Sequence, residues 1–249
     1  MKKRLTLALQ QASFALLGLT LATTPVWADH NPSHSEQTTS EYQRPTFTGA
    51  NKTERLALLE KLSTPGNPSS TEQKRQLLLL KLALFANSAD QSLKPLEMIT
   101  DDLQSYLKSA KSDYEIMAAF GSALSLQSIF YQRNLGKMNF LARKGMRYMD
   151  RAVKKSATHL GVRLLRGLSY ANMPAFLSRA SFAEKDLNLL KTQMKDSDGK
   201  FIEFIDYYLA MALVKNKKAE QAKTLWNQLA INKASDWSSK ASEQLKDHF

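Results

Sequence analysis

The chain has 249 residues, of which 43% are hydrophobic and 23% charged, and its formal net charge is +12. This composition fits one ordinary globular domain with a sizeable core. Nine glycines and seven prolines are few for a sandwich or barrel with many tight turns, so helices are favoured. The absence of cysteine excludes disulfides, and the fold must therefore depend on its core.

The first 28 residues have the layout of a secretory signal peptide. Residues 2–4 are basic, residues 14–22 are densely apolar, and the sequence VWA precedes a cleavage site after Ala28. An uncleaved membrane anchor fits less well, because the apolar stretch after residues 2–4 is short for a span and contains Gln10 and Gln11. No cysteine is available for lipid attachment, so we expect a soluble periplasmic protein if the source is Gram-negative. Cleavage removes three basic residues and no acidic one, which leaves a net charge of +9.

The rest of the chain divides into a polar segment and a helical one. Residues 29–50 are rich in Ser and Thr and lack an apolar period, which predicts a disordered linker. In residues 51–249 the apolar positions follow helical spacing, and no segment alternates with period two for long. We expect an all-α domain of antiparallel helices with short loops. The expected helices cover residues 52–62, 71–88, 96–110, 114–132, 137–156, 159–172, 182–194, 200–215, 218–232 and 237–247.

Small and aromatic residues near the C-terminus recur at a characteristic spacing. Small residues stand at Ala210 and Ala222, and Trp226 follows. This spacing resembles the tetratricopeptide repeat, in which small residues let two helices cross closely and an aromatic residue fills the gap. Gly145 and Gly167 fall in a second, partial match. The resemblance implies helix-hairpin repeats that stack into a superhelix.

A tighter resemblance covers about residues 145–230. Its features are the MDRAV helix end, the Arg-x-x-Arg-Gly-x-x-Tyr helix, Pro174 and the acidic helix after it. These features are similar to those of exported bacterial helical-repeat proteins. One branch of that class is the periplasmic tetratricopeptide-like subunit associated with TRAP-type solute transporters. The resemblance implies a fold and a compartment more than an activity.

The sequence contains no signature of a catalytic, cofactor or metal site. It has no phosphate-binding glycine loop, no Gly-x-Ser-x-Gly and no thiol. His30 and His34 are two ligands in a flexible tail and do not close a metal site. Residues 196–200 partly match a calcium loop, but a turn with Asp198 or Ser197 capping the next helix fits better. We therefore expect a protein that is not an enzyme.

The basic residues are concentrated in one segment. Between residues 133 and 179 eleven basic residues accompany a single acid, Asp150. On a helical wheel of residues 137–155 the cations fall opposite the apolar stripe, and such a face attracts anions. The apolar stripe holds Met138, Leu141, Gly145, Met149, Ala152 and Val153, and the cationic face holds Arg143, Lys144, Arg147, Arg151, Lys154 and Lys155.

Several partners suit this cationic face: phospholipid headgroups, lipopolysaccharide phosphates, anionic glycans or an acidic protein. The alternative is a solvated face without any partner. We do not expect nucleic acid, because the protein is exported and the face lacks an interleaved aromatic platform. We do not expect membrane insertion, because the apolar side of the helix is needed for packing.

Two arginines, Arg163 and Arg166, stand beside the leucine stripe of the helix at 159–172. If they are structural, each meets an acid, because partly buried arginines are usually paired. Asp206 lies at the position equivalent to Arg163 two helices later, which favours that pair. If they bind a ligand, the two arginines fork an anion with Tyr170 alongside. The acids considered as structural partners are Asp206, Glu203, Glu184 and Asp186.

These features predict an exported scaffold or adaptor that mediates protein–protein interaction in the periplasm or envelope. The alternative is a binding module for a small anionic ligand, possibly accessory to a solute transporter. A closed pocket around Arg163, Arg166 and Tyr170 would favour the ligand module. An open groove with an exposed apolar patch would favour the adaptor.

The predicted signal peptide is testable on the protein recovered from the envelope fraction. N-terminal sequencing should give Asp29 as the first residue, because cleavage follows the small residue at Ala28. A membrane-embedded chain that retains Met1 would contradict the prediction.

Overall fold

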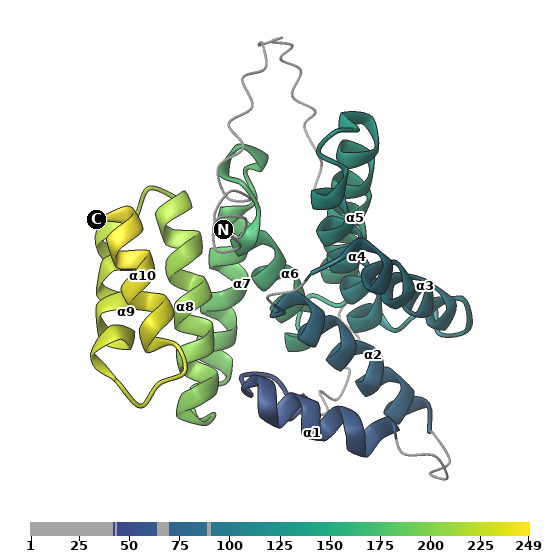
Figure 1. Ribbon diagram of the computed structural model, residues 1–249, viewed down its shortest axis with the longest axis horizontal. Coiled ribbons are helices and arrows are strands. Elements are labelled where there is room, and N and C mark those ends of the chain that lie inside the picture. The colour runs from purple at the N-terminus through teal and green to yellow at the C-terminus, as the bar shows by residue number, and fades with distance from the viewer. Residues whose placement is uncertain (1–41, 43, 64–69, 89–90) are drawn as a thin grey trace, which may run out of the picture. The chain divides into compact units, whose positions relative to one another are not determined.

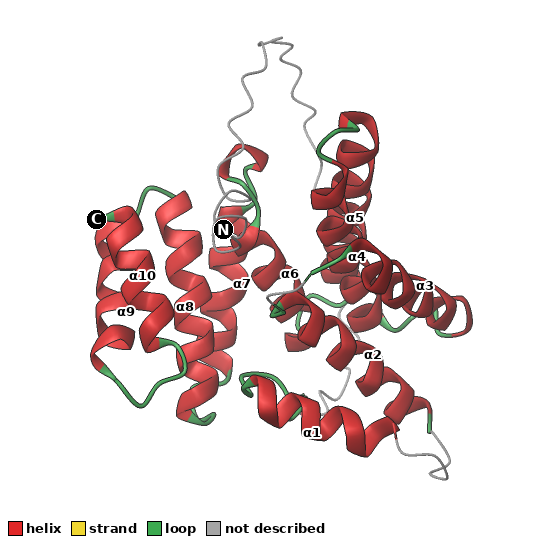
Figure 2. Ribbon diagram, in the orientation of Figure 1, coloured by secondary structure: helices red, strands yellow, loops and turns green. Residues whose placement is uncertain are grey.

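The computed structural model describes residues 42, 44–63, 70–88 and 91–249, and this part of the chain contains ten α-helices and no strand (Figures 1 and 2). Helical residues make up 78% of it. The all-α prediction is confirmed, and adjacent helices pack in a way consistent with a helical-repeat arrangement. The predicted signal peptide, His30 and His34 lie outside the described residues.

All ten expected helices are present, with small shifts at their ends. A short 3-10 turn, η1 (Ile129–Tyr131), precedes α5, and another, η2 (Ala175–Leu177), precedes α7. The helices are α1 (Lys52–Ser63), α2 (Thr71–Ala86), α3 (Leu93–Ser109), α4 (Tyr114–Ser128), α5 (Leu135–Lys155), α6 (Leu160–Asn172), α7 (Ala180–Gln193), α8 (Gly199–Lys215), α9 (Ala219–Ile231) and α10 (Ser238–His248).

Polar side chains define several helix starts. The Asp198 carboxylate accepts a hydrogen bond from the Phe201 backbone N–H at 2.9 Å, so the predicted cap of α8 is confirmed. Asn134 caps α5 in the same way, and Ser70 forms a capping box with Gln73 at the start of α2. Each cap satisfies a backbone N–H that the first turn leaves without a partner.

The core is divided along the chain rather than concentrated at one centre. One cluster of buried apolar side chains draws mainly on α2, α3 and α4, and a larger one draws mainly on α6 to α10. A third, small cluster joins α4, α5 and α6. Burial between neighbouring helices is the way in which repeat proteins are stabilised. The positions predicted from the repeat spacing, Ala210, Ala222 and Trp226, are all fully buried.

Two glycines let α4 and α5 approach closely. A Cβ atom built on Gly145 would lie 2.4 Å from the carbonyl oxygen of Gly121 and 2.9 Å from the backbone nitrogen of Ser125. A Cβ atom on Gly121 would lie 2.6 Å from the Gly145 carbonyl oxygen. Contacts this short with backbone are not tolerated, so the crossing requires glycine on both helices. The crossing fixes which side of α5 is turned away from α4.

The compact part of the chain begins earlier than the sequence predicted. It starts at Tyr42 rather than at Asn51, and residues 46–49 form a turn in which Phe47 is buried. Buried Arg55 holds this turn by donating to the Phe47 carbonyl oxygen at 3.1 Å. The linker predicted for residues 29–50 therefore does not include residues 44–50. One apolar side chain in a polar stretch left no periodic signal.

The α4–α5 crossing can be tested with two glycines of α5. Gly145→Ala should lower the free energy of unfolding by about 1–3 kcal/mol, because the methyl group overpacks against backbone. Gly136→Ala is the matched control, since the nearest atom that its Cβ would meet is 3.6 Å away. The control should leave stability unchanged or raise it by up to about 1 kcal/mol. Equal effects in urea unfolding would contradict the close crossing.

Candidate binding surfaces

The two arginines of α6 meet one buried carboxylate on α7. Asp186 has no exposed surface, and its Oδ2 accepts from Arg166 Nε at 2.7 Å. Its Oδ1 accepts from Arg166 Nη2 at 3.0 Å and from Arg163 Nη1 at 2.7 Å. Arg166 thus makes the paired, fork-like contact that guanidinium and carboxylate groups favour. Gly167 allows this approach, because its missing side chain leaves room for Leu187 and Asp186 on α7.

A second carboxylate, Asp150 on α5, extends the network. It accepts from Arg166 Nη1 at 3.2 Å, from Arg179 Nη1 at 3.2 Å and from the Tyr170 hydroxyl at 2.9 Å. Burial and the charge of Asp150 raise the pKa of Tyr170, so the hydroxyl stays protonated and donates. Burial alone lowers the pKa of Arg166, but the hydrogen bonds and charge of Asp186 outweigh it, and the pKa is raised. The network joins α5, α6 and α7.

The predicted pairing of Arg163 with Asp206 is wrong. Asp206 instead accepts from Lys191 at 2.6 Å. The repeat register relates equivalent positions in successive repeats, whereas the nearest acid belongs to α7, the next helix along the chain. Among the acids considered, Asp186 is the one that both arginines contact. Glu184 instead accepts from Asn216 and Lys218, and Glu203 accepts from Asn232 and Ser235.

Sequence reasoning missed three members of this network: Asp150, Arg179 and Phe182. The guanidinium carbon of Arg166 lies 5.3 Å from the centroid of the Phe182 ring, and that of Arg179 lies 5.7 Å from it. Asp150 could have been found, because a single acid among eleven bases has an electrostatic reason to be paired. The guanidinium groups expected to fork an anionic ligand are thus held by carboxylates of the same chain.

The cations of α5, unlike the paired arginines of α6, face solvent. Arg143, Arg147, Arg151, Lys154 and Lys155 are exposed, and Lys144 is half-exposed. None of these six forms an ion pair with a residue of the described part. The apolar stripe on the other side of α5 is buried apart from half-exposed Met138, so the helical phase predicted from the sequence is confirmed. We call the six cations the basic face.

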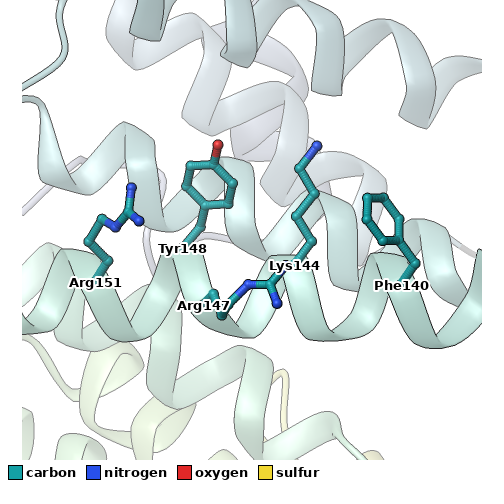
Figure 3. A pocket seen from close by; sticks show the side chains of 5 residues that line it. All are labelled: Phe140, Lys144, Arg147, Tyr148 and Arg151. Atoms are coloured by element: carbon teal, nitrogen blue, oxygen red, sulfur yellow. The ribbon is translucent and has the colours of Figure 1, made fainter.

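Two aromatic residues interrupt the basic face and form a depression with three of its cations. Figure 3 shows Phe140, Lys144, Tyr148 and Arg151 projecting from the same side of α5. With Arg147 they line an open hollow of about 260 Å³. This arrangement corrects the expectation that the face has no interleaved aromatic residues. An aromatic residue on a polar face adds little to a periodic pattern, so the wheel did not reveal it.

The two rings of the hollow differ in exposure. Phe140 is 56% exposed, and the ammonium group of Lys144 lies 5.7 Å from its ring centroid. Tyr148 is half-buried and packs edge-on against Phe120 of α4, with 4.9 Å between ring centroids. The guanidinium carbon of Arg151 lies 6.0 Å from the Tyr148 centroid. The hollow therefore has one exposed ring and one anchored ring, each beside a cation.

The described part of the chain offers neither a metal site nor a membrane span. There, no three His, Asp or Glu side chains are grouped so that they could hold a metal ion. None of the helices described is both long and apolar enough to cross a bilayer. Comparisons with protein-family models, with curated proteins and with solved structures gave no match for this chain.

The ion-pair network predicts a specific pattern of coupling. Arg163→Ala should lower the free energy of unfolding by about 1–3 kcal/mol. Asp186→Ala should cost more, about 3–5 kcal/mol, because it leaves two guanidinium groups without their buried counter-charge. The double variant should lose less than the sum, since the two residues are in contact.

The control cycle uses Arg163 and Asp206, which the structure does not pair. Arg163→Ala combined with Asp206→Ala should be additive to within about 0.5 kcal/mol, because the two side chains share no partner. Urea unfolding of the five variants and the parent chain gives both cycles. Additive losses at Arg163 and Asp186 would contradict the network.

Proposed function

We propose that the protein is an exported, non-enzymatic scaffold or adaptor that binds another protein in the periplasm or envelope. The observation that carries this proposal is the basic face of α5, whose cations face solvent and form no ion pair with any residue that the structure describes. Charges arranged in this way steer an oppositely charged partner and fix its orientation. The helical-repeat packing supports the proposal, because repeat proteins commonly use extended surfaces for binding.

The alternative, a module for a small anionic ligand, has less support. It requires Arg163 and Arg166 to offer their N–H groups to the ligand. Both arginines donate to Asp186, and Arg166 also donates to Asp150. An incoming anion would have to displace carboxylates that are already paired, one of them fully buried. The resemblance to a subunit of TRAP-type transporters supports export and the repeat fold without requiring a ligand at these arginines.

The proposed function predicts that the basic face is needed for binding and not for folding. The triple variant Arg143→Glu, Arg147→Glu and Arg151→Glu should unfold within about 0.5 kcal/mol of the parent, because these side chains are exposed. Recovery of partner proteins from envelope extract by the immobilised mature chain should fall. The remaining binding should lose its dependence on salt.

The matched control reverses three exposed lysines elsewhere: Lys185→Glu, Lys195→Glu and Lys233→Glu. It changes the net charge by the same amount, so it separates the location of the charges from their number. Partner recovery should be retained in the control. An equal loss in both variants would show that only net charge matters, and a strongly destabilised triple arginine variant would show that α5 is oriented differently.

A further inference from the structure

We propose that the hollow on α5 is the docking point for an acidic polypeptide segment that carries one large apolar side chain among its carboxylates. The apolar side chain lies against Phe140, and the carboxylates meet Lys144, Arg147 and Arg151. This inference rests on the proposed function, since it names the kind of partner that the basic face takes.

The composition of the hollow is that of the centre of a protein interface. Two aromatic residues and two arginines make up four of its five lining residues. Aromatic residues and arginine are enriched at interface cores and at the positions that carry most of the binding energy, whereas lysine is depleted. Phe140 also exposes more than half of its surface to water on an otherwise cationic face. Covering that ring is a gain that a purely ionic partner would not provide.

The size of the hollow favours a side chain over a metabolite. Its volume of about 260 Å³ is open to solvent on one side. Pockets that enclose small-molecule ligands measure roughly 300–1,000 Å³ and bury most of the ligand. All five lining residues belong to α5, so the hollow cannot close around a free molecule. One apolar side chain of a longer segment fits the hollow, and the rest of the segment can continue along α5.

The spacing of the cations suits a chain of carboxylates. Lys144, Arg147 and Arg151 follow one another at three and four residues, so they extend along one side of α5 over about 10 Å at 1.5 Å per residue. Guanidinium groups bind carboxylates in a paired, fork-like manner. Unlike Arg163 and Arg166, these cations have no carboxylate of the described part to neutralise them. Charge complementarity therefore points to an acidic segment.

The hollow is also held in place before any partner arrives. Tyr148 packs on Phe120, and the Gly121–Gly145 crossing fixes the helix beneath it. A surface that is ordered in advance loses less conformational entropy when it binds.

Two other polyanions fit the hollow less well. A bilayer would need a broad apolar face for insertion, whereas the apolar side of α5 is buried against its neighbours. A single-stranded nucleic acid would need successive rings on which bases stack, whereas Tyr148 is half-buried and Phe140 alone presents an exposed ring in the hollow.

The proposal can be tested with defined probes. The mature chain is titrated into fluorescein-labelled EEEEEFEEEEE and into EEEEEAEEEEE, and binding is followed by fluorescence anisotropy. The phenylalanine peptide should bind about fivefold more tightly, since the open hollow buries only part of the extra ring. Phe140→Ala should remove this difference. Phe176→Ala, which changes a 67% exposed phenylalanine in η2, should leave it intact.

The charge requirement is tested separately. The double variant Arg147→Gln and Arg151→Gln should lower the affinity for both peptides by about tenfold and reduce the salt dependence of their binding. Circular dichroism melts of all variants should match the parent, because every changed side chain is exposed. Equal affinity for the two peptides in the parent chain would overturn the proposal. So would a tenfold preference for phosphatidylglycerol vesicles or for oligo(dT) that depends on Phe140.

Failure of this proposal is distinguishable from failure of the proposed function. If Phe140→Ala recovers the same partners from envelope extract while the triple arginine variant does not, the adaptor role stands and the apolar anchor is wrong. If neither variant changes the recovered partners, the basic face is not the binding surface, and both proposals fail.

Discussion

The carboxylate of Asp186 is the group on which the middle of the structure depends. A fully buried charge is tolerated only when counter-charges and hydrogen bonds replace the water that it loses. Asp186 obtains both from Arg163 and Arg166, which fixes α7 against α6. Arg166 then donates to Asp150 and so extends the same network to α5. The orientation of α5, and with it the direction of the basic face, follows from this network together with the glycine crossing to α4.

The same device recurs nearer the N-terminus. Arg75 of α2 donates to Asp113 at 3.0 Å and also to the buried carboxylate of Glu115, at the start of α4. Glu115 accepts in addition from the Tyr42 hydroxyl, and burial together with the charge of Glu115 raises the pKa of that hydroxyl. Gly161 of α6 leaves the space that this carboxylate occupies. In both places an arginine on one helix satisfies a buried acid on another, so the ion pairs determine which helices can be neighbours.

The sequence predicted the helices well, because apolar spacing is a local property that each segment carries by itself. It predicted the exposed side of α5 for the same reason. It failed where contacts depend on the neighbouring helix: Asp206 was chosen by repeat register, whereas Asp186 is nearer in space. It also missed Phe47 and Phe140, because an isolated apolar residue in a polar context leaves no periodic trace. The roles of Asp186, Phe47 and Phe140 depend on contacts with other parts of the chain, so they become visible only when the neighbouring helices are in place.

The two sets of arginines show how the chain distributes its positive charge. In the α6 network every arginine has a carboxylate partner, and these ion pairs hold three helices together. On α5, Arg143, Arg147 and Arg151 follow one another at four-residue intervals, a spacing at which like charges repel by about 0.2–0.5 kcal/mol per pair. The one acid of this stretch, Asp150, accepts from Arg166, Arg179 and Tyr170 and forms no ion pair with these three arginines. Departures from a local rule without a structural gain are expected where function requires them. The acidic partner proposed for the basic face would remove this repulsion.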